Sequence, residues 1–153
     1  MGERFPLLCL FPLRLLVGAM LVLAGYHKFL DGWFHGTALM VILDGWMRDH
    51  RSYHFIVPVV NTAHAHPKIF GALVTMGEMV IGAAMVVGLF TRFVSILGTL
   101  IFFTFAFASG EHLTPPGPAM LVGAIFFTFL FAPPGRVLGL DHALRAKLPA
   151  WLA

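Results

Sequence analysis

The sequence has little charge and almost no cysteine. Lys, Arg, Asp and Glu make up 11% of the 153 residues, whereas hydrophobic residues make up 59%. Soluble domains contain about 25% charged residues, so this composition excludes a soluble globular domain and predicts an integral membrane protein. The formal net charge is only +3 and the basic residues are scattered, which argues against nucleic acid as a partner. The single cysteine, Cys9, excludes an intrachain disulfide and a CxxC redox pair.

Four apolar runs dominate the rest of the chain, at about residues 5–30, 69–90, 93–109 and 118–132. A run of about 20 apolar residues can cross a bilayer as a helix, and lipid offers no partner for unpaired backbone groups. We therefore predict an all-α fold, an integral membrane four-helix bundle that forms a single domain over residues 1–153. The first run contains Arg14 and ends without a small-residue cleavage site, so we expect a retained span rather than a signal peptide.

The long connection between the first two spans, residues 31–68, contains one amphipathic pattern. Its apolar residues recur at helical spacing: Leu39, Ile42, Leu43, Trp46 and Met47. This pattern predicts an interfacial amphipathic helix, which either lies in the plane of the membrane surface or caps the mouth of the bundle. We expect Pro58 and Pro67 to break the segment that follows, and Asn61–His66 to be irregular.

One carboxylate, Glu78, lies near the middle of the second run, where a charge costs about 2.5–3.5 kcal/mol on insertion scales. Such a residue normally faces other helices and has a partner. At about 1.5 Å per residue, Arg14 of the first run lies within roughly 4–5 Å of the same depth. We therefore expect Arg14 and Glu78 to meet, either as a structural ion pair or as groups that bind a ligand or exchange protons.

Small residues accompany these charges. Spacings of three and four place two sets of residues on one helix face each: Arg14, Gly18, Leu21, Gly25 and Lys28 in the first run, and Gly71, Thr75, Glu78 and Gly82 in the second. Small residues allow close approach of membrane helices. This pattern predicts close packing of the first two spans, with Lys28 and Thr75 as further candidate site residues.

Seven of the eight histidines fall on the side of the membrane opposite the two chain ends. His64 and His66 form a His-Ala-His pair, and His27 and His112 end two spans near the same surface, so these four are candidate metal ligands. His-x-His alone is a weak pattern, and no histidine lies deep within a span. A metal or haem centre is therefore the less favoured interpretation.

Short motifs along the chain resemble those of the DoxX/DoxD family of small four-helix membrane proteins. They are Arg14-Leu-Leu-Val-Gly18, Gly25-Tyr-His-Lys28, Gly77-Glu78 with Gly82, Gly88-Leu-Phe-Thr91-Arg92, Pro134-Gly135-Arg136 and Gly139-Leu-Asp141. The resemblance implies association with quinone-linked redox enzymes, such as a terminal quinol oxidase or a thiosulfate:quinone oxidoreductase. It also implies that Arg14, Lys28, Glu78 and Arg92 carry the family character.

These observations leave two functions open. The first is a membrane subunit of a quinone-linked oxidoreductase that contributes a quinone or lipid pocket around Arg14 and Glu78. The second is a structural accessory subunit that packs against a larger membrane complex without ligand chemistry. No flavin, nucleotide or iron–sulfur motif is present, so we do not expect a self-sufficient enzyme. We expect membrane lipids and a larger membrane complex as partners, and a bacterial-type inner membrane location with both termini in the cytoplasm.

Overall fold

The structure, a computed structural model, describes residues 9–112, 115–136 and 139–144. The predicted spans correspond to α2 (Phe11–Leu30), α5 (Pro67–Val87), α6 (Thr91–Ser109) and α7 (Pro118–Phe131). α2, α5 and α6 are each long and apolar enough to cross a membrane, and α7 is a shorter apolar helix. Residues 5–8 of the predicted first span and the basic tail from Arg145 onward lie outside the described residues. The all-α membrane fold is confirmed.

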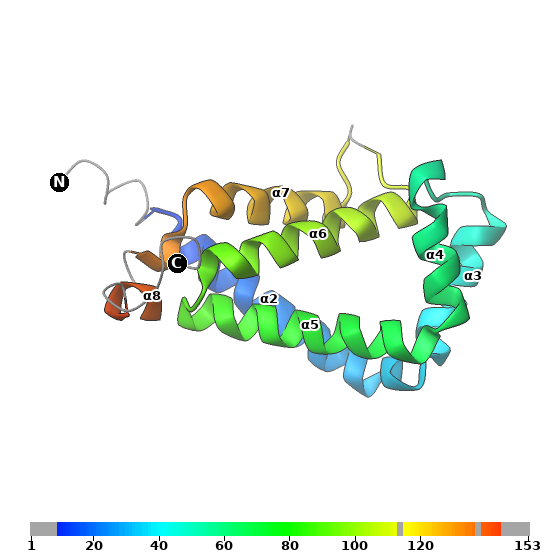
Figure 1. Cartoon of the computed structure of the whole chain (residues 1–153), viewed down its shortest axis with the longest axis horizontal. Coiled ribbons are helices and arrows are strands. Elements are labelled where there is room, and N and C mark those ends of the chain that lie inside the picture. The colour runs from blue at the N-terminus through cyan, green and yellow to red at the C-terminus, as the bar shows by residue number, and fades with distance from the viewer. Residues whose placement is uncertain (1–8, 113–114, 137–138, 145–153) are drawn as a thin grey trace.

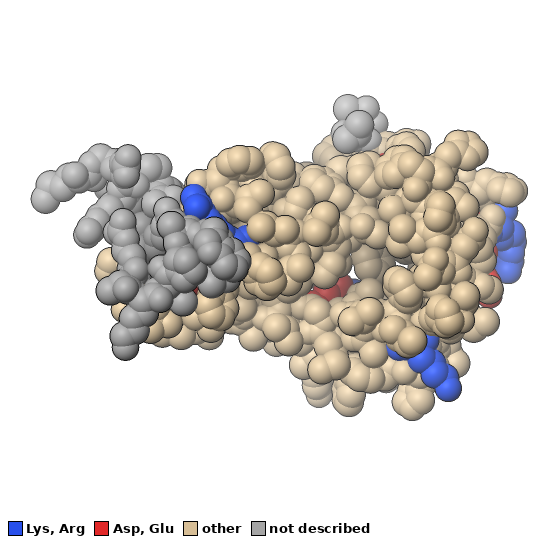
Figure 2. Space-filling view, viewed as in Figure 1, with Lys and Arg blue, Asp and Glu red and all other residues tan. Residues whose placement is uncertain are grey.

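The four long helices form two pairs (Figure 1). α2 packs against α5, and α6 packs against α7. The pairs are close together at the end where the short α8 (Leu140–Ala143) lies, and they diverge toward the opposite end. On the face shown, the space-filling view has most of its Lys and Arg toward the two ends of the molecule and few charged side chains between them (Figure 2). This distribution is the one expected for a protein whose middle lies in lipid.

Close contact between glycines fixes how α2 and α5 pack. A side-chain carbon placed on Gly82 would lie 2.7 Å from the Gly18 carbonyl oxygen, and one on Gly18 would lie 2.9 Å from the Gly82 oxygen. One on Gly25 would lie 2.9 Å from the carbonyl oxygen of Thr75. The predicted packing of these two small-residue faces is therefore confirmed, and its register pairs Gly18 with Gly82 and Gly25 with Thr75.

The long connection folds into a cap at the open end of the bundle. It contains 3₁₀ turns at Trp33–His35 and His54–Ile56, and two helices, α3 (Thr37–Arg48) and α4 (Val57–Ala65). The apolar stripe of α3 packs onto the bundle, where Leu39 and Leu43 are each 2% exposed. The amphipathic helix is confirmed, and its apolar residues have the contacts expected of a cap.

The segment after α3 is helical, which corrects the expectation that residues 61–66 are irregular. Pro58 and Pro67 occupy the first turns of α4 and α5 rather than breaking helices. Proline is favoured in the first helical turn, where its missing N–H has no intrahelical partner to lose. The two prolines therefore start helices, and only the bend at His66 separates α4 from α5.

The turn between α5 and α6 is held by a buried carboxylate from α8. Gly88 and Phe90 have positive φ angles of 73° and 52°, so the chain reverses within three residues. The Asp141 side chain, in a residue only 1% exposed, accepts hydrogen bonds from the Phe90 N–H (2.7 Å), the Thr91 N–H (2.9 Å) and the Thr91 hydroxyl (2.7 Å). Asp141 thus caps the N-terminus of α6 and attaches α8 to the closed end of the bundle.

The glycine contact predicts a specific sensitivity to side-chain volume. Replacing Gly82 with Leu forces α2 and α5 apart, and we expect it to destabilise the folded protein by about 1–3 kcal/mol or more. The measurement is the thermal unfolding midpoint of purified protein in detergent.

Gly45 in α3 provides the matched control, because a side-chain carbon there meets nothing within 4 Å. We expect Gly45→Ala to leave the midpoint unchanged or to raise it slightly, since alanine favours helix by about 1 kcal/mol over glycine. An unchanged midpoint for Gly82→Leu would contradict the close packing of α2 on α5.

Candidate functional site

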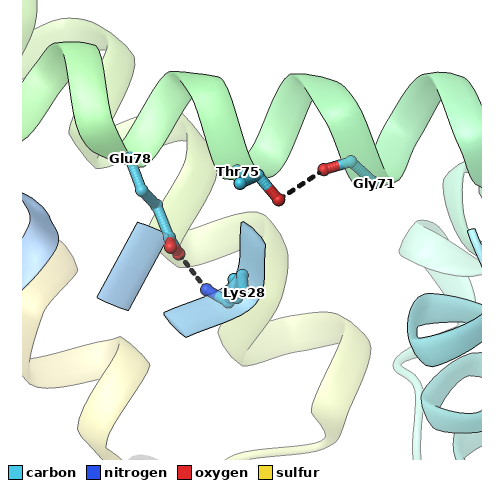
Figure 3. Close-up of polar contacts among 4 residues, drawn as sticks. All are labelled: Lys28, Gly71, Thr75 and Glu78. Atoms are coloured by element: carbon cyan, nitrogen blue, oxygen red, sulfur yellow. Dashed lines mark hydrogen bonds and ion pairs between the residues drawn. The ribbon is translucent and has the colours of Figure 1, made fainter. Parts of the chain in front are cut away.

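The buried carboxylate of Glu78 forms an ion pair with Lys28 (Figure 3). Lys28 lies in the last turn of α2, and the two side chains point toward one another across the interface with α5. The Glu78 side chain is 4% exposed and the Lys28 side chain 22% exposed. The Lys28 ammonium also lies 5.1 Å from the ring centre of Trp33 and 5.8 Å from that of Phe105. Aromatic rings at these distances stabilise a cation that has lost water.

Arg14 does not provide the partner predicted for Glu78, and helix register gives the reason. Continuing the Gly18–Gly82 register places Arg14 opposite Val86, and Arg14 indeed approaches the Val86 carbonyl oxygen with Nη2 at 3.5 Å. Val86 lies eight residues beyond Glu78, which is roughly 12 Å along the helix.

Side-chain direction adds to this offset. Helical side chains lean toward the N-terminus of their own helix. Arg14 therefore leans away from Glu78, whereas Lys28 leans toward it. The prediction that Arg14 and Glu78 meet is therefore wrong, and the ion pair joins Glu78 to Lys28 instead.

Thr75 lies one turn before Glu78 on the same buried face and is itself fully buried. Its hydroxyl donates a hydrogen bond to the Gly71 carbonyl oxygen at 2.8 Å (Figure 3). The hydroxyl proton is thus already donated within α5, whereas the hydroxyl oxygen can still accept a hydrogen bond. The structure brings Thr75, Glu78 and Lys28 together and leaves Arg14 at the closed end.

One oxygen of the Glu78 carboxylate, Oε2, is buried and has no hydrogen-bond partner among the described residues. Buried polar atoms are nearly always hydrogen-bonded, and leaving one unpaired costs about 1–3 kcal/mol. The arrangement is therefore well suited to a ligand hydroxyl or water that donates a hydrogen bond to Oε2.

An apolar cavity of about 280 Å³ lies between α5 and α6 beneath the cap. Aromatic side chains from three helices form part of its wall: Trp46, Phe70 and Phe105. The Phe105 ring, whose centre is 5.8 Å from the Lys28 ammonium, forms part of this wall, so the ion pair lies next to the cavity although neither Lys28 nor Glu78 lines it. Figure 2 shows the molecule hollowed between the two helix pairs, with acidic surface in the hollow.

The cavity opens sideways, between helices, rather than toward the ends of the bundle. Three of its lining residues are strongly exposed apolar side chains, Val59 at 40%, Leu73 at 62% and Leu100 at 62%. They belong to α4, α5 and α6, so the opening of the cavity is bordered by exposed apolar side chains.

The candidate metal ligands do not converge. In the part of the chain that the structure describes, no three His, Cys, Asp or Glu side chains form a group that could hold a metal ion. His64 lies against Asp44, with Nε2 2.8 Å from Oδ1, which joins α4 to α3. His66 lies at the bend between α4 and α5, and His27 is exposed in the last turn of α2. His112 follows the end of α6.

Two carboxylates with well-defined roles were not identified from the sequence. Asp141 caps α6, as described above, and Glu111 caps α7 by accepting hydrogen bonds from the backbone N–H groups of Ala119 (3.1 Å) and Met120 (2.8 Å). For Glu111 the available signal was an acidic residue shortly before the Pro-initiated α7, where a negative charge complements the helix dipole. For Asp141, which lies 50 residues from Thr91 in the sequence, no local pattern was available. Trp46 and Phe105 were also not singled out as parts of a cavity wall.

The fold and the site together define a small all-α membrane protein with a charged pair between its first two spans. A family model described as DoxX matches residues 9–111, and the chain belongs to the DoxX family. The match includes Arg14, Lys28, Glu78 and Arg92, and it runs through the capping connection. The closing motif around Asp141 lies beyond the matched residues. No curated protein and no solved structure matched the chain.

The Lys28–Glu78 pair predicts non-additive effects of substitution. Lys28→Met and Glu78→Met each leave the other charge buried without its partner, and we expect each to cost about 3 kcal/mol. The double variant removes both charges and should regain most of that loss. The measurement is a double-mutant cycle of unfolding free energies or thermal midpoints in detergent.

Asp49→Asn is the control, because its ion pair with Arg51 joins side chains that are 46% and 60% exposed. Exposed pairs contribute about 0–1 kcal/mol, so we expect little change. Strictly additive losses for Lys28 and Glu78 would show that the two side chains do not stabilise one another.

Proposed function

We propose that the protein is a membrane subunit that binds a quinone, or a lipid-like molecule with a similar polar head, beside Lys28 and Glu78. The observation that carries this proposal is the position of the ion pair. A buried carboxylate with one unpartnered oxygen lies behind a wall of an aromatic-lined cavity, and that cavity opens toward lipid. Molecules dissolved in the bilayer combine an apolar body with a few polar atoms, and this site offers complementary groups for both.

Each residue has a role that follows from its chemistry. Lys28 donates a charge-assisted hydrogen bond to a carbonyl oxygen. Glu78 accepts a hydrogen bond from a hydroxyl at Oε2, and it can take the proton when that hydroxyl is oxidised. The rings of Trp46, Phe70 and Phe105 provide flat apolar surfaces for a planar ligand.

The chain needs a redox partner for such chemistry. Oxidation of a quinol releases two protons and two electrons, and the sequence contains no flavin, nucleotide or iron–sulfur motif that could take the electrons. We therefore infer that the protein works within a larger membrane complex whose other subunit carries the redox centre. Membership of the DoxX family, which the resemblance above associates with quinone-linked redox enzymes, supports this inference.

We further infer that the protein lies in a bacterial-type cell membrane. The end of the bundle where α8 packs would then face the cytoplasm. By sequence, five basic residues belong to the side of the two termini, Arg4, Arg92, Arg136, Arg145 and Lys147, against four on the side of the cap, Lys28, Arg48, Arg51 and Lys68. The tendency of basic residues to lie on the cytoplasmic side therefore favours a cytoplasmic location for the α8 end of the bundle.

A structural accessory subunit is the second candidate. It is favoured by the same ion pair, because a Lys–Glu contact between α2 and α5 can serve only to fix their register. The two candidates differ in what the purified protein retains. Native mass spectrometry from membrane lipid would find a partner with an empty bundle for the accessory subunit, and a bound quinone or lipid for the first proposal.

The binding proposal predicts losses of affinity for a short-chain quinone analogue, decylubiquinone. Removing a charge-assisted hydrogen bond costs about 1.5–3 kcal/mol, which corresponds to roughly 10- to 150-fold weaker binding. We expect the doubly neutral variant Lys28→Met/Glu78→Met, which retains fold stability, to show at least this loss. The measurement is a titration monitored by tryptophan fluorescence in detergent or nanodiscs.

A second pair of variants tests the cavity itself. Val74 lines the cavity, whereas Val80 on the same helix is 64% exposed and lies outside it. Val74→Trp should fill the cavity and abolish binding, and Val80→Trp should not. Equal binding by the native protein and all three variants would overturn the proposal.

A further inference from the structure

A second cavity lies on the other side of the cap from the lipid-facing one. It has a volume of about 560 Å³, and its wall includes polar side chains from the turn after α3, the 3₁₀ turn that follows and α4: His50, Ser52, His54 and Asn61. At ~30 Å³ per molecule in the liquid, this volume has room for on the order of ten or more waters. His50 and His54 are exposed, so this cavity is continuous with the surface at the cap end.

Two side chains line both cavities, Trp46 and Val60. Val60 is 3% exposed, and the Trp46 ring packs edge-on against Phe105, with 6.0 Å between the ring centres. The wall between the cavities is thus about one side chain thick. The first cavity is lined almost entirely by apolar side chains, whereas the second combines four polar side chains with Met47, Val57 and the two shared residues.

The wall is attached to α6 by hydrogen bonds. The Ser52 hydroxyl, from the polar cavity, donates to the carbonyl oxygen of Ala108, which lines the apolar cavity (2.6 Å). The Tyr53 N–H donates to the Phe107 carbonyl oxygen at 3.1 Å. These contacts hold the end of α3 in place, and Trp46 with it.

We propose that the polar cavity is a water-filled inlet from the cap surface, and that Trp46 is the partition that keeps this water out of the lipid-facing cavity. Trp46 then limits the length of the apolar cavity and keeps it separate from the water on the other side. The polar side chains of the second cavity, His50, His54 and Asn61, supply hydrogen-bonding groups to that water.

This inference concerns water access and stands without the quinone proposal. The test therefore measures the reach of a water-soluble reagent and needs no ligand. Failure of quinone binding and failure of the partition are then separate results.

The experiment uses single cysteines in a Cys9→Ser background, because Cys9 is exposed. Asn61→Cys reports on the polar cavity, Val74→Cys on the apolar cavity, and Leu23→Cys, 58% exposed on α2, on the lipid face. Each is labelled in sealed vesicles with a charged, membrane-impermeant methanethiosulfonate reagent, and labelling rates are measured by mass spectrometry. Adding the reagent to vesicles of either orientation shows from which side the cavity is reached.

We expect Asn61→Cys to react from one side of the membrane, and Val74→Cys and Leu23→Cys to react at least 100-fold more slowly. Adding Trp46→Ala should raise the Val74→Cys rate at least tenfold and leave Leu23→Cys unreactive. Trp46→Phe, which retains a ring, should keep Val74→Cys protected.

Three results would overturn the proposal. Unreactive Asn61→Cys would show that the polar cavity is not hydrated. Rapid reaction of Val74→Cys with Trp46 present would show that there is no partition. An unchanged Val74→Cys rate in Trp46→Ala would place the barrier elsewhere. Reaction of Leu23→Cys in the Trp46→Ala background would reveal general unfolding. The Val74→Cys labelling rate is then compared between the Trp46→Phe and Trp46→Leu backgrounds, and its dependence on side-chain size at position 46 decides whether this side chain is the partition.

Discussion

Contact between the backbones of α2 and α5 is the constraint on which the rest of the structure depends. Gly18 and Gly82 allow an approach that any side chain would prevent, and this approach fixes the register of the two helices. Register and the lean of helical side chains then decide that Glu78 meets Lys28. Without this contact, a carboxylate in the apolar middle of the bundle would have no cation within reach.

Other charged side chains that the structure describes near the membrane also have hydrogen-bond partners. Asp141 accepts three hydrogen bonds at the start of α6, and Glu111 accepts two at the start of α7. Unpaired N–H groups at helix starts are costly away from water, and a carboxylate both accepts their hydrogen bonds and complements the helix dipole. Together with Glu78, which pairs with Lys28, these carboxylates all have structural partners within the bundle or at its ends.

The sequence was sufficient for the parts of the fold that depend on local pattern. Apolar run length predicted the four long helices to within a few residues, and small-residue spacing predicted the faces of α2 and α5. The partner of Glu78 was missed because depth was counted from the ends of apolar runs, whereas α2 begins at Phe11 and register is set by the glycines. α4 was missed because a proline reads as a helix breaker until its position in the first turn is known. The cavity joins residues from four helices, so no local pattern could indicate it.

The cavity lies where the two helix pairs diverge. α2 and α5 meet through glycines, and α6 and α7 meet where Gly98 receives the ring of Phe126 and Gly123 that of Phe103. The pairs are close together at the α8 end and diverge beyond the α5–α6 turn, and the cap covers the end that this leaves open. The space between them is therefore bounded by contacts that lie within each pair, and it lies next to the buried Lys28–Glu78 pair.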